Sequence, residues 1–177
     1  MNIVLKNNLA QRHECSAIVE LIRFLGNSTN HDSTDEGVIY YSGQQIAEEN
    51  EFIYGLLGVI AGRVKTAAEI MAGEYLSISQ LAIFKTVPGH TPEEHADSQN
   101  MDGSPKDGCS DFLVSAVVYF NDDFTGGELV FPKVGYSYQP IAGDCILFPS
   151  TTDYSHYVDR VAEGERIVLP LWFSGVG

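Results

Sequence analysis

Apolar side chains repeat with two different periods along the chain, and the period changes near residue 74. In residues 10–25 and 46–71 they recur every three or four positions, which places them on one face of a helix. From residue 74 onward they alternate with polar side chains or form short apolar runs, as in β-strands. The pattern predicts two or three helices followed by about eight strands.

The second helical segment contains three glycines, Gly55, Gly58 and Gly62, and each glycine costs a helix interior about 1 kcal/mol. Close packing of this helix against a sheet would explain such small residues. A break of the helix near the glycines is the alternative, and the pattern leaves both explanations open.

The second part of the chain has the pattern of short strands separated by turns. Residues 112–120 are apolar almost throughout, which predicts a strand buried on both faces. Helices first and strands afterwards indicate an α+β fold whose main body is a jelly roll, with the helices packed on one sheet. The expected strands are residues 38–41, 76–84, 95–97, 112–120, 127–131, 136–140, 145–148, 154–158 and 166–173.

The length of 177 residues predicts one domain, with residues 1–73 as helical support and residues 74–177 as the jelly-roll core. The formal net charge is −14. This charge argues against binding to nucleic acid or to anionic membranes, because both need a basic surface.

Three cysteines, Cys15, Cys109 and Cys145, stand far apart in the sequence, which excludes a disulfide framework and a zinc knuckle. The first residues lack the apolar core of a signal peptide. No apolar run approaches the roughly 18 residues of a membrane-spanning helix. A reducing cytoplasm is therefore the expected location.

His95 and Asp97 are candidates for ligands of one metal ion. Residues i and i+2 of an extended strand project from the same face, about 6.6 Å apart along it, so an imidazole and a carboxylate can converge there. His156 is the candidate third ligand. Two histidines and one carboxylate form the facial triad of non-haem Fe(II) oxygenases, which leaves positions open for O2 and a co-substrate. Surface or core packing explains either histidine alone, so the prediction depends on the combination.

Arg166 begins a strand whose two faces differ. The odd positions from Ile167 to Phe173 are wholly apolar, and if they pack on the helices, Arg166 points into the barrel. A buried arginine needs a partner, either an internal acidic side chain or the carboxylate of a small ligand. The triad upstream favours the ligand. Tyr119 on the strand 112–120 could bind the same carboxylate through its hydroxyl.

The candidate residues lie in a series of short segments that follow one another in a set order. They are HAD at 95–97, AVVYFN at 116–121, GGELVFP at 126–132, AGDCILF at 142–148, and then His156, Arg166, Trp172 and Phe173. In this order they resemble the Fe(II)/2-oxoglutarate dioxygenase superfamily, and within it the prolyl 4-hydroxylase type. The likeness covers about residues 75–174.

The resemblance implies a fold and a metal. The fold is a double-stranded β-helix, which is the jelly roll, and the metal is Fe(II) bound by His95, Asp97 and His156. Related halogenases carry a small residue in place of the carboxylate ligand, so Asp97 argues against that chemistry.

The resemblance also implies how the co-substrate binds. Arg166, helped by Tyr119, would bind the distal carboxylate of 2-oxoglutarate, and Leu129 would face the co-substrate. Trp172 matches an aromatic residue of prolyl hydroxylases and is a candidate substrate contact. Ascorbate is a candidate reductant. One departure is that residues 91–94 lack the tyrosine that prolyl hydroxylases usually have before the first ligand.

The expected function is therefore Fe(II)- and 2-oxoglutarate-dependent hydroxylation of a peptide or protein, in the manner of a prolyl 4-hydroxylase. Three alternatives stay open: hydroxylation of a free amino acid or other small metabolite, a non-catalytic metal-binding jelly roll, and a cupin-like isomerase or dioxygenase without 2-oxoglutarate. The polar loops 27–35 and 98–111 are expected to flank the pocket mouth and to close on the substrate. The oligomeric state is left open.

Overall fold

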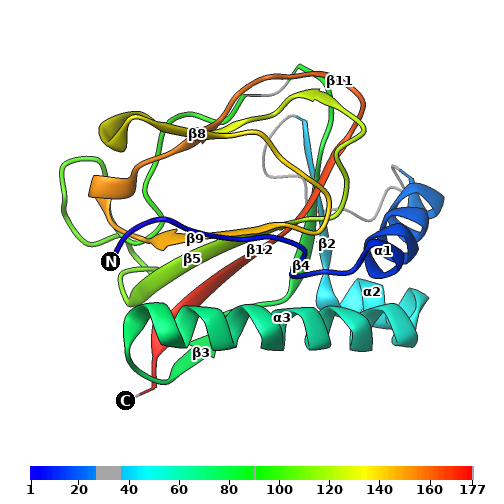
Figure 1. Cartoon of the computed structure of the whole chain (residues 1–177), viewed down its shortest axis with the longest axis horizontal. Helices are drawn as coiled ribbons and strands as arrows, with labels where there is room; N and C mark the ends of the chain where they lie inside the picture. The colour runs from blue at the N-terminus through cyan, green and yellow to red at the C-terminus, as the bar shows by residue number, and fades with distance from the viewer. Residues whose placement is uncertain (27–36, 90, 177) are drawn as a thin grey trace.

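A mixed arrangement of helices and sheets is seen in the computed structural model, which describes residues 1–26, 37–89 and 91–176. The helices α1 (Arg12–Leu25), α2 (Gly43–Glu49) and α3 (Glu51–Ala72) lie on one side of a large sheet, and a smaller sheet lies on the other side (Figure 1). This arrangement confirms the predicted α+β class, with three α-helices among the described residues.

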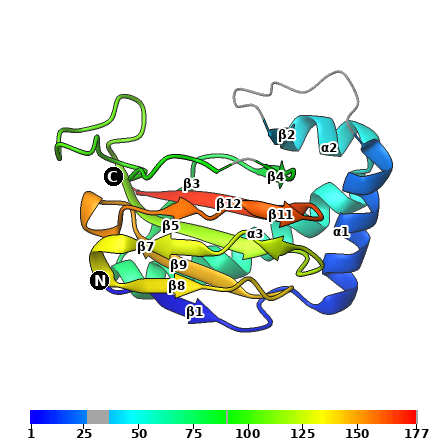
Figure 2. The ribbon, with the colours of Figure 1, turned by 90° about the horizontal axis from the view of Figure 1, so that it is seen from above.

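The described residues form twelve strands. The major sheet has the order β1-β9-β5-β12-β4-β2, with β3 paired to β12, and the minor sheet has the order β10-β7-β8. Strands β6 and β11 form a separate pair. Figure 2 shows β7 and β8 lying over the β9 and β5 part of the major sheet. The strands are β1 (Val4–Lys6), β2 (Val38–Ser42), β3 (Leu76–Ile78), β4 (Ala82–Thr86), β5 (Phe112–Tyr119), β6 (Thr125–Gly126), β7 (Leu129–Phe131), β8 (Tyr136–Tyr138), β9 (Cys145–Pro149), β10 (Tyr157–Val158), β11 (Val161–Glu163) and β12 (Arg166–Gly175).

The predicted count of about eight strands is not confirmed. Strand β1 has only three residues and was not predicted, and it joins the edge of the major sheet by pairing with β9. Strand β2 lies where residues 38–41 predict it and pairs with β4. The major sheet therefore takes strands from before residue 74 as well as after it.

The long helical pattern is divided at Asn50 and nowhere near the glycines. The Asn50 side chain accepts a hydrogen bond from the backbone N–H of Ile53 and so caps α3. Gly55, Gly58 and Gly62 lie on the exposed face of α3, where an added Cβ would meet no atom within 4 Å. Both explanations offered for the glycines, close packing against the sheet and a nearby break, were therefore wrong.

The segment 76–84 was predicted as one strand and is two. Ile78 pairs with Phe173 and Phe84 pairs with Val168, so the segment carries one residue more than β12 between these pairings. The extra residue interrupts the ladder between β3 and β4, as in a β-bulge. The alternation of apolar and polar residues breaks at the same place, because Ser79 and Gln80 are two consecutive polar residues and both are exposed. The sequence therefore carries a trace of the interruption, although the prediction ran the strand through it.

The helix-covered side of the major sheet holds the main hydrophobic core. Helix α3 contributes Ile53, Leu57, Ile60 and Val64, and β12 contributes Ile167, Leu169, Leu171 and Phe173 to this core. The apolar face predicted for the last strand therefore does pack on the helices. The opposite face of β12 points between the two sheets.

No helix in the described part of the chain has the length and apolar character needed to cross a membrane. The predicted loop 27–35 lies outside the described residues. The predicted loop 98–111 has no helix or strand and contains one isolated pairing, Gln99 with Pro105.

Candidate functional site

His95 and His156 face each other across a single antiparallel bridge. The backbone N–H of His95 donates to the carbonyl of His156 at 3.0 Å, and the N–H of His156 donates to the carbonyl of His95 at 2.8 Å. Residues 95–97 are not the strand that was predicted, because the pairing stops after His95 and the chain bends at Asp97. The next residue, Ser98, is held by hydrogen bonds from its backbone and its hydroxyl to the carbonyl of Ser150, both 2.9 Å.

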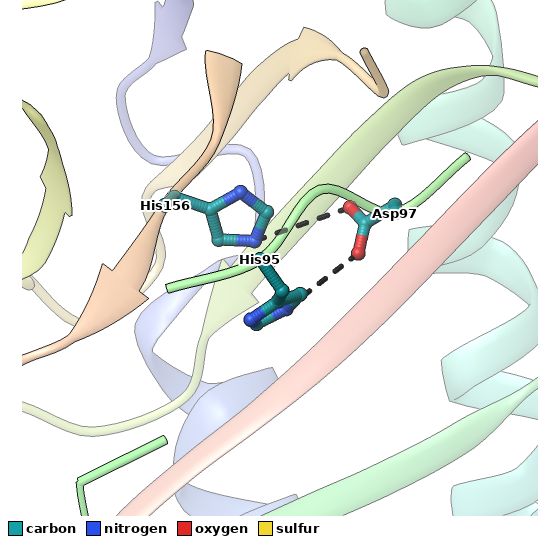
Figure 3. A group of neighbouring side chains, drawn as sticks. All are labelled: His95, Asp97 and His156. Atoms are coloured by element: carbon teal, nitrogen blue, oxygen red, sulfur yellow. Dashed lines mark ion pairs between the residues drawn. The ribbon is translucent and has the colours of Figure 1, made fainter. Parts of the chain in front are cut away.

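The side chains of His95, Asp97 and His156 converge (Figure 3). The His95 Nε2 atom lies 3.8 Å from Asp97 Oδ1, and His156 Nε2 lies 4.0 Å from Asp97 Oδ2. One donor atom from each residue lies within 4.8 Å of the other two. Two imidazole nitrogens and one carboxylate oxygen form a donor set that suits Fe(II), so the residues present fit a single metal ion.

Both imidazole rings are oriented by the backbone. The Nδ1 atom of His95 lies 2.9 Å from the carbonyl of Glu93, and the Nδ1 atom of His156 lies 3.1 Å from the carbonyl of Tyr154. Because a carbonyl only accepts, Nδ1 carries the hydrogen in each ring and Nε2 keeps its lone pair free for a metal. Burial lowers the pKa of His156, which favours the neutral form that binds metal.

Arg166 lies buried beside Tyr119, with its guanidinium carbon 5.2 Å from the centre of the tyrosine ring. The Nε atom of Arg166 and the hydroxyl of Tyr119 are buried and have no hydrogen-bond partner among the described residues. Burial raises the pKa of Tyr119 to about 12, so its hydroxyl stays protonated and remains a donor. Two unpartnered buried donors side by side are suited to an anion.

Gly127 helps to hold the arginine in place. Its φ is +69°, and a Cβ there would meet the ring of Phe124 at 2.8 Å and the Cδ of Arg166 at 3.2 Å. The absence of a side chain therefore lets the aliphatic part of Arg166 pass close to the backbone.

A cavity of about 450 Å³ between the two sheets connects the metal-binding residues with the arginine. Apart from these groups its walls are mainly apolar. Of the described residues, the cavity is lined by Val38, Tyr40, Gln80, Phe84, Thr86, Pro92, His95, Asp97, Ser115, Ala116, Val117, Leu129, Phe148, His156, Val158, Arg166, Val168, Pro170 and Trp172. The structure thus brings six of the seven candidate residues to one cavity. The seventh, Tyr119, does not line it but contacts Arg166, with its ring centre 5.2 Å from the guanidinium carbon.

A second cavity, which the sequence gave no reason to expect, adjoins the first. It has a volume of about 360 Å³ and shares Gln80, Asp97 and Trp172 with the first cavity. Three residues of the loop 98–111 also line it: Lys106, Gly108 and Cys109. Nothing in the composition of that loop distinguishes these three from their neighbours.

Comparison with known families and proteins identifies related chains. The sequence profile described as "2OG-Fe(II) oxygenase superfamily" matches residues 79–174. Prolyl 3-hydroxylase 2 of Rattus norvegicus is 40% identical over 65 residues, which cover 34% of this chain and 9% of that protein. This chain therefore matches only a small part of that relative.

Two further relatives match along most of the chain. A putative prolyl 4-hydroxylase of Acanthamoeba polyphaga mimivirus is 22% identical over 183 aligned positions, which cover 94% of this chain and 72% of that protein. The viral collagen prolyl hydroxylase of Paramecium Bursaria Chlorella virus-1, solved as a 2OG complex, superposes with a TM-score of 0.69 and 16% identity. The superposition covers 100% of this chain and 97% of that one, and it indicates a shared fold.

Proposed function

The chain belongs to the 2OG-Fe(II) oxygenase superfamily, and on this premise we propose that it hydroxylates a prolyl residue of a peptide with Fe(II) and 2-oxoglutarate. The observation that carries the proposal is the single cavity into which a convergent His-Asp-His set and a buried arginine both open. The part of the cavity with the His-Asp-His set suits Fe(II), and the part with the arginine suits 2-oxoglutarate, the two cofactors of this superfamily.

We assign the metal to His95, Asp97 and His156. These residues offer three donor atoms within 4.8 Å of one another, all three line the cavity, and they would hold one ion there. The hydrogen bonds from Nδ1 of His95 and of His156 to backbone carbonyls fix the orientations of the two rings before any metal binds.

We assign the far carboxylate of 2-oxoglutarate to Arg166. The guanidinium provides charge and paired N–H donors, and the Tyr119 hydroxyl is a further donor beside it. Leu129 lines the same cavity and would pack on the carbon chain of the co-substrate. The apolar walls keep water away from the reacting atoms.

The bound iron and co-substrate would supply the oxidising power for hydroxylating a C–H bond. The residues of this chain supply binding, orientation and exclusion of water. The substrate would enter beside Trp172, which is half-buried at the rim of the cavity. Ascorbate is the proposed reductant that keeps the iron active between turnovers.

The prolyl peptide is supported by the relatives, since the proteins matched along most of the chain have names that describe prolyl hydroxylases. A free amino acid or small metabolite is the second candidate, supported by the cavity volume of about 450 Å³, which lies in the range of small-molecule sites. A non-catalytic metal-binding jelly roll is the third, and it has no use for the unpartnered Arg166.

The test is incubation of the iron-loaded protein with 2-oxoglutarate, ascorbate and proline-containing peptides or free amino acids. We expect succinate release together with the gain of one oxygen atom by a prolyl peptide, with fragmentation distinguishing 3-hydroxyproline from 4-hydroxyproline. Oxygen gain only by a free amino acid would replace the peptide proposal with the second candidate. Binding of iron without any succinate release would favour the non-catalytic protein.

We also propose that residues 1–177 form one oxygenase domain of the double-stranded β-helix type, with residues 1–73 as support and 74–177 as core. The minor sheet facing the major sheet across the cavity supports this. A cytoplasmic location is supported by the three free cysteines, Cys15, Cys109 and Cys145.

A further inference from the structure

The two cavities meet at Trp172. This side chain lines both cavities, as do Gln80 and Asp97. The Trp172 ring lies with its centre 6.2 Å from that of Phe84, which lines the first cavity. It also stacks on the ring of Phe112, which lines the second cavity, with 6.2 Å between the ring centres and an angle of 21° between the ring planes. A substrate bound at the metal can therefore extend over Trp172 into the second cavity.

Lys106 is the only basic residue among the described residues that line the second cavity. Its Nζ lies 3.4 Å from the carbonyl oxygen of Ala96, at the peptide bond that leads into Asp97. This distance makes a weak hydrogen bond. In the described part of the chain no acidic side chain lies within ion-pair distance of Lys106, although the whole chain has 24 acidic and 10 basic residues.

The charge balance of the second cavity changes when metal binds. Asp97 is the acidic residue that shares this cavity with Lys106. A metal ion held by Asp97 would neutralise the negative charge of that carboxylate, and the Lys106 ammonium group would then have no counter-charge among the described residues that line the cavity. A half-buried ammonium in that position favours an anionic ligand.

We propose that the second cavity binds a carboxylate of the substrate through Lys106, so that the preferred substrate is a peptide with an acidic group near the hydroxylated residue. This proposal rests on the proposed function. Phe112 and Trp172 provide an apolar surface for the intervening chain. The exposed amide of Gln80, at the interruption between β3 and β4, is placed to bind the peptide backbone. The carboxylate can come from an Asp or Glu side chain or from the end of the peptide.

The test uses matched proline-containing peptides. One arm places Glu or Gln at each position flanking the proline in turn, and a second arm compares free C-terminal acids with C-terminal amides. Binding is measured by calorimetry with iron but without 2-oxoglutarate, so that no turnover occurs, and hydroxylation is measured separately by mass. We expect one Glu position, or the C-terminal acid, to bind about tenfold more tightly than its neutral counterpart, as for a hydrogen bond between charged groups.

The variants are Lys106→Met and the control Lys133→Met. Lys133 also donates to a backbone carbonyl, that of Thr152 at 2.7 Å, but it lines neither cavity in the described structure. Each variant removes one positive charge. We expect Lys106→Met to abolish the preference for the acidic peptide, mainly by raising the Kd and KM of that peptide. We expect Lys133→Met to keep the preference.

Equal weakening of acidic and neutral peptides by Lys106→Met, together with weaker iron binding, would overturn the proposal, because Lys106 would then only hold the Ala96 carbonyl. Equal binding of acidic and neutral peptides to the wild-type protein would overturn it as well. If no peptide is hydroxylated, the proposed function fails. The carboxylate contact is then decided by binding of glutamate against glutamine, and equal binding of these two would overturn it too.

Discussion

The two sides of the major sheet differ in how completely their polar groups are paired. On the helix-covered side, the buried Glu14 carboxylate binds Arg63 through both oxygens, at 2.7 and 2.8 Å. On the cavity side, Arg166 Nε and the Tyr119 hydroxyl are buried without a partner in the described structure, and the donor atoms of His95, Asp97 and His156 converge within 4.8 Å of one another.

Strand β12 contributes to both sides, one residue after another. Ile167 and Leu169 pack under the helices, while Arg166 and Val168 line the cavity. Because neighbouring positions of a strand face opposite ways, substitutions one residue apart should affect stability in one case and binding in the other. The following experiments test that division.

The largest effect is expected for His156→Ala. Loss of one of three ligands should weaken iron binding by more than about 100-fold. Removal of a residue that only hydrogen-bonds to a metal ligand already weakens metal binding by up to about 100-fold. Metal titration of the variant measures this. The exposed His13→Ala is the control and should keep its iron affinity. Undiminished iron affinity in His156→Ala would contradict the assignment.

Leu169→Ala should lower the free energy of unfolding by about 2–5 kcal/mol, as for other buried leucines replaced by alanine. The side chain is fully buried under the helices. Urea unfolding measures the loss, and Val168→Ala on the cavity side is the comparison. A larger loss for Val168→Ala than for Leu169→Ala would remove the distinction between the two faces.

Arg166→Met should weaken 2-oxoglutarate binding by about 2–5 kcal/mol, the usual loss when one member of a buried charge pair is removed. The free energy of unfolding should stay the same or rise, because the variant removes a buried cation that has no acidic partner in the described structure. Calorimetry measures the first and urea unfolding the second. The 2-oxoglutarate affinity of Arg166→Lys should lie between those of the wild type and Arg166→Met, because lysine keeps the positive charge but lacks the planar guanidinium with its paired N–H donors. Unchanged affinity in Arg166→Met would show that the arginine is structural.

Tyr119→Phe should weaken 2-oxoglutarate binding by about 1 kcal/mol, the value of one hydrogen bond. Stability should not fall, because the hydroxyl has no partner in the described structure. Calorimetry measures the co-substrate affinity and urea unfolding measures the stability. A clear loss of stability with full co-substrate affinity would mean that the hydroxyl serves the fold.

The smallest effect concerns the paired side. The Arg63 guanidinium, which is hydrogen-bonded to Glu14, holds the pKa of that carboxyl below its usual range. A carboxyl whose pKa is lowered by folding stabilises the folded state when the pH is above its pKa in the unfolded chain, which is about 4.3. This stabilisation disappears as the pH falls through the pKa of the carboxyl in the folded state. Arg63→Met should therefore be less stable than the wild type by at most about 1 kcal/mol at neutral pH. Unfolding measured from pH 7 down to pH 2 should show this difference shrinking, and a constant difference would contradict it.

The sequence predicts the features that depend on side-chain alternation. The two faces of β12 were predicted because each odd position from 167 to 173 is apolar. Strand β5 was predicted from a continuous apolar run at residues 112–120. The candidate metal ligands were selected by their chemical types and order, and the structure brings all three to one cavity.

Other features depend on pairing between distant segments, which periodicity does not report. The single bridge between His95 and His156 takes the place of a strand. The extra residue after Ile78 interrupts a ladder, and its mark in the sequence is only the pair of consecutive polar residues Ser79 and Gln80. The exposed glycines of α3 have no packing role within the described chain. The second cavity arises only because the loop carrying Lys106 folds back beside Trp172.

The bridge between His95 and His156 also connects folding to iron. Its two hydrogen bonds join distant parts of the chain, so the ligands come together only after the sheets have formed, and the unfolded chain holds no such set. With His95, Asp97 and His156 assigned as its ligands, iron would bind the native state alone. At a free concentration of 100 times its Kd it would add about 2.7 kcal/mol to the free energy of unfolding. The melting temperature should therefore report iron occupancy, and chains made under iron limitation should be cleared faster by proteases that act on the unfolded form.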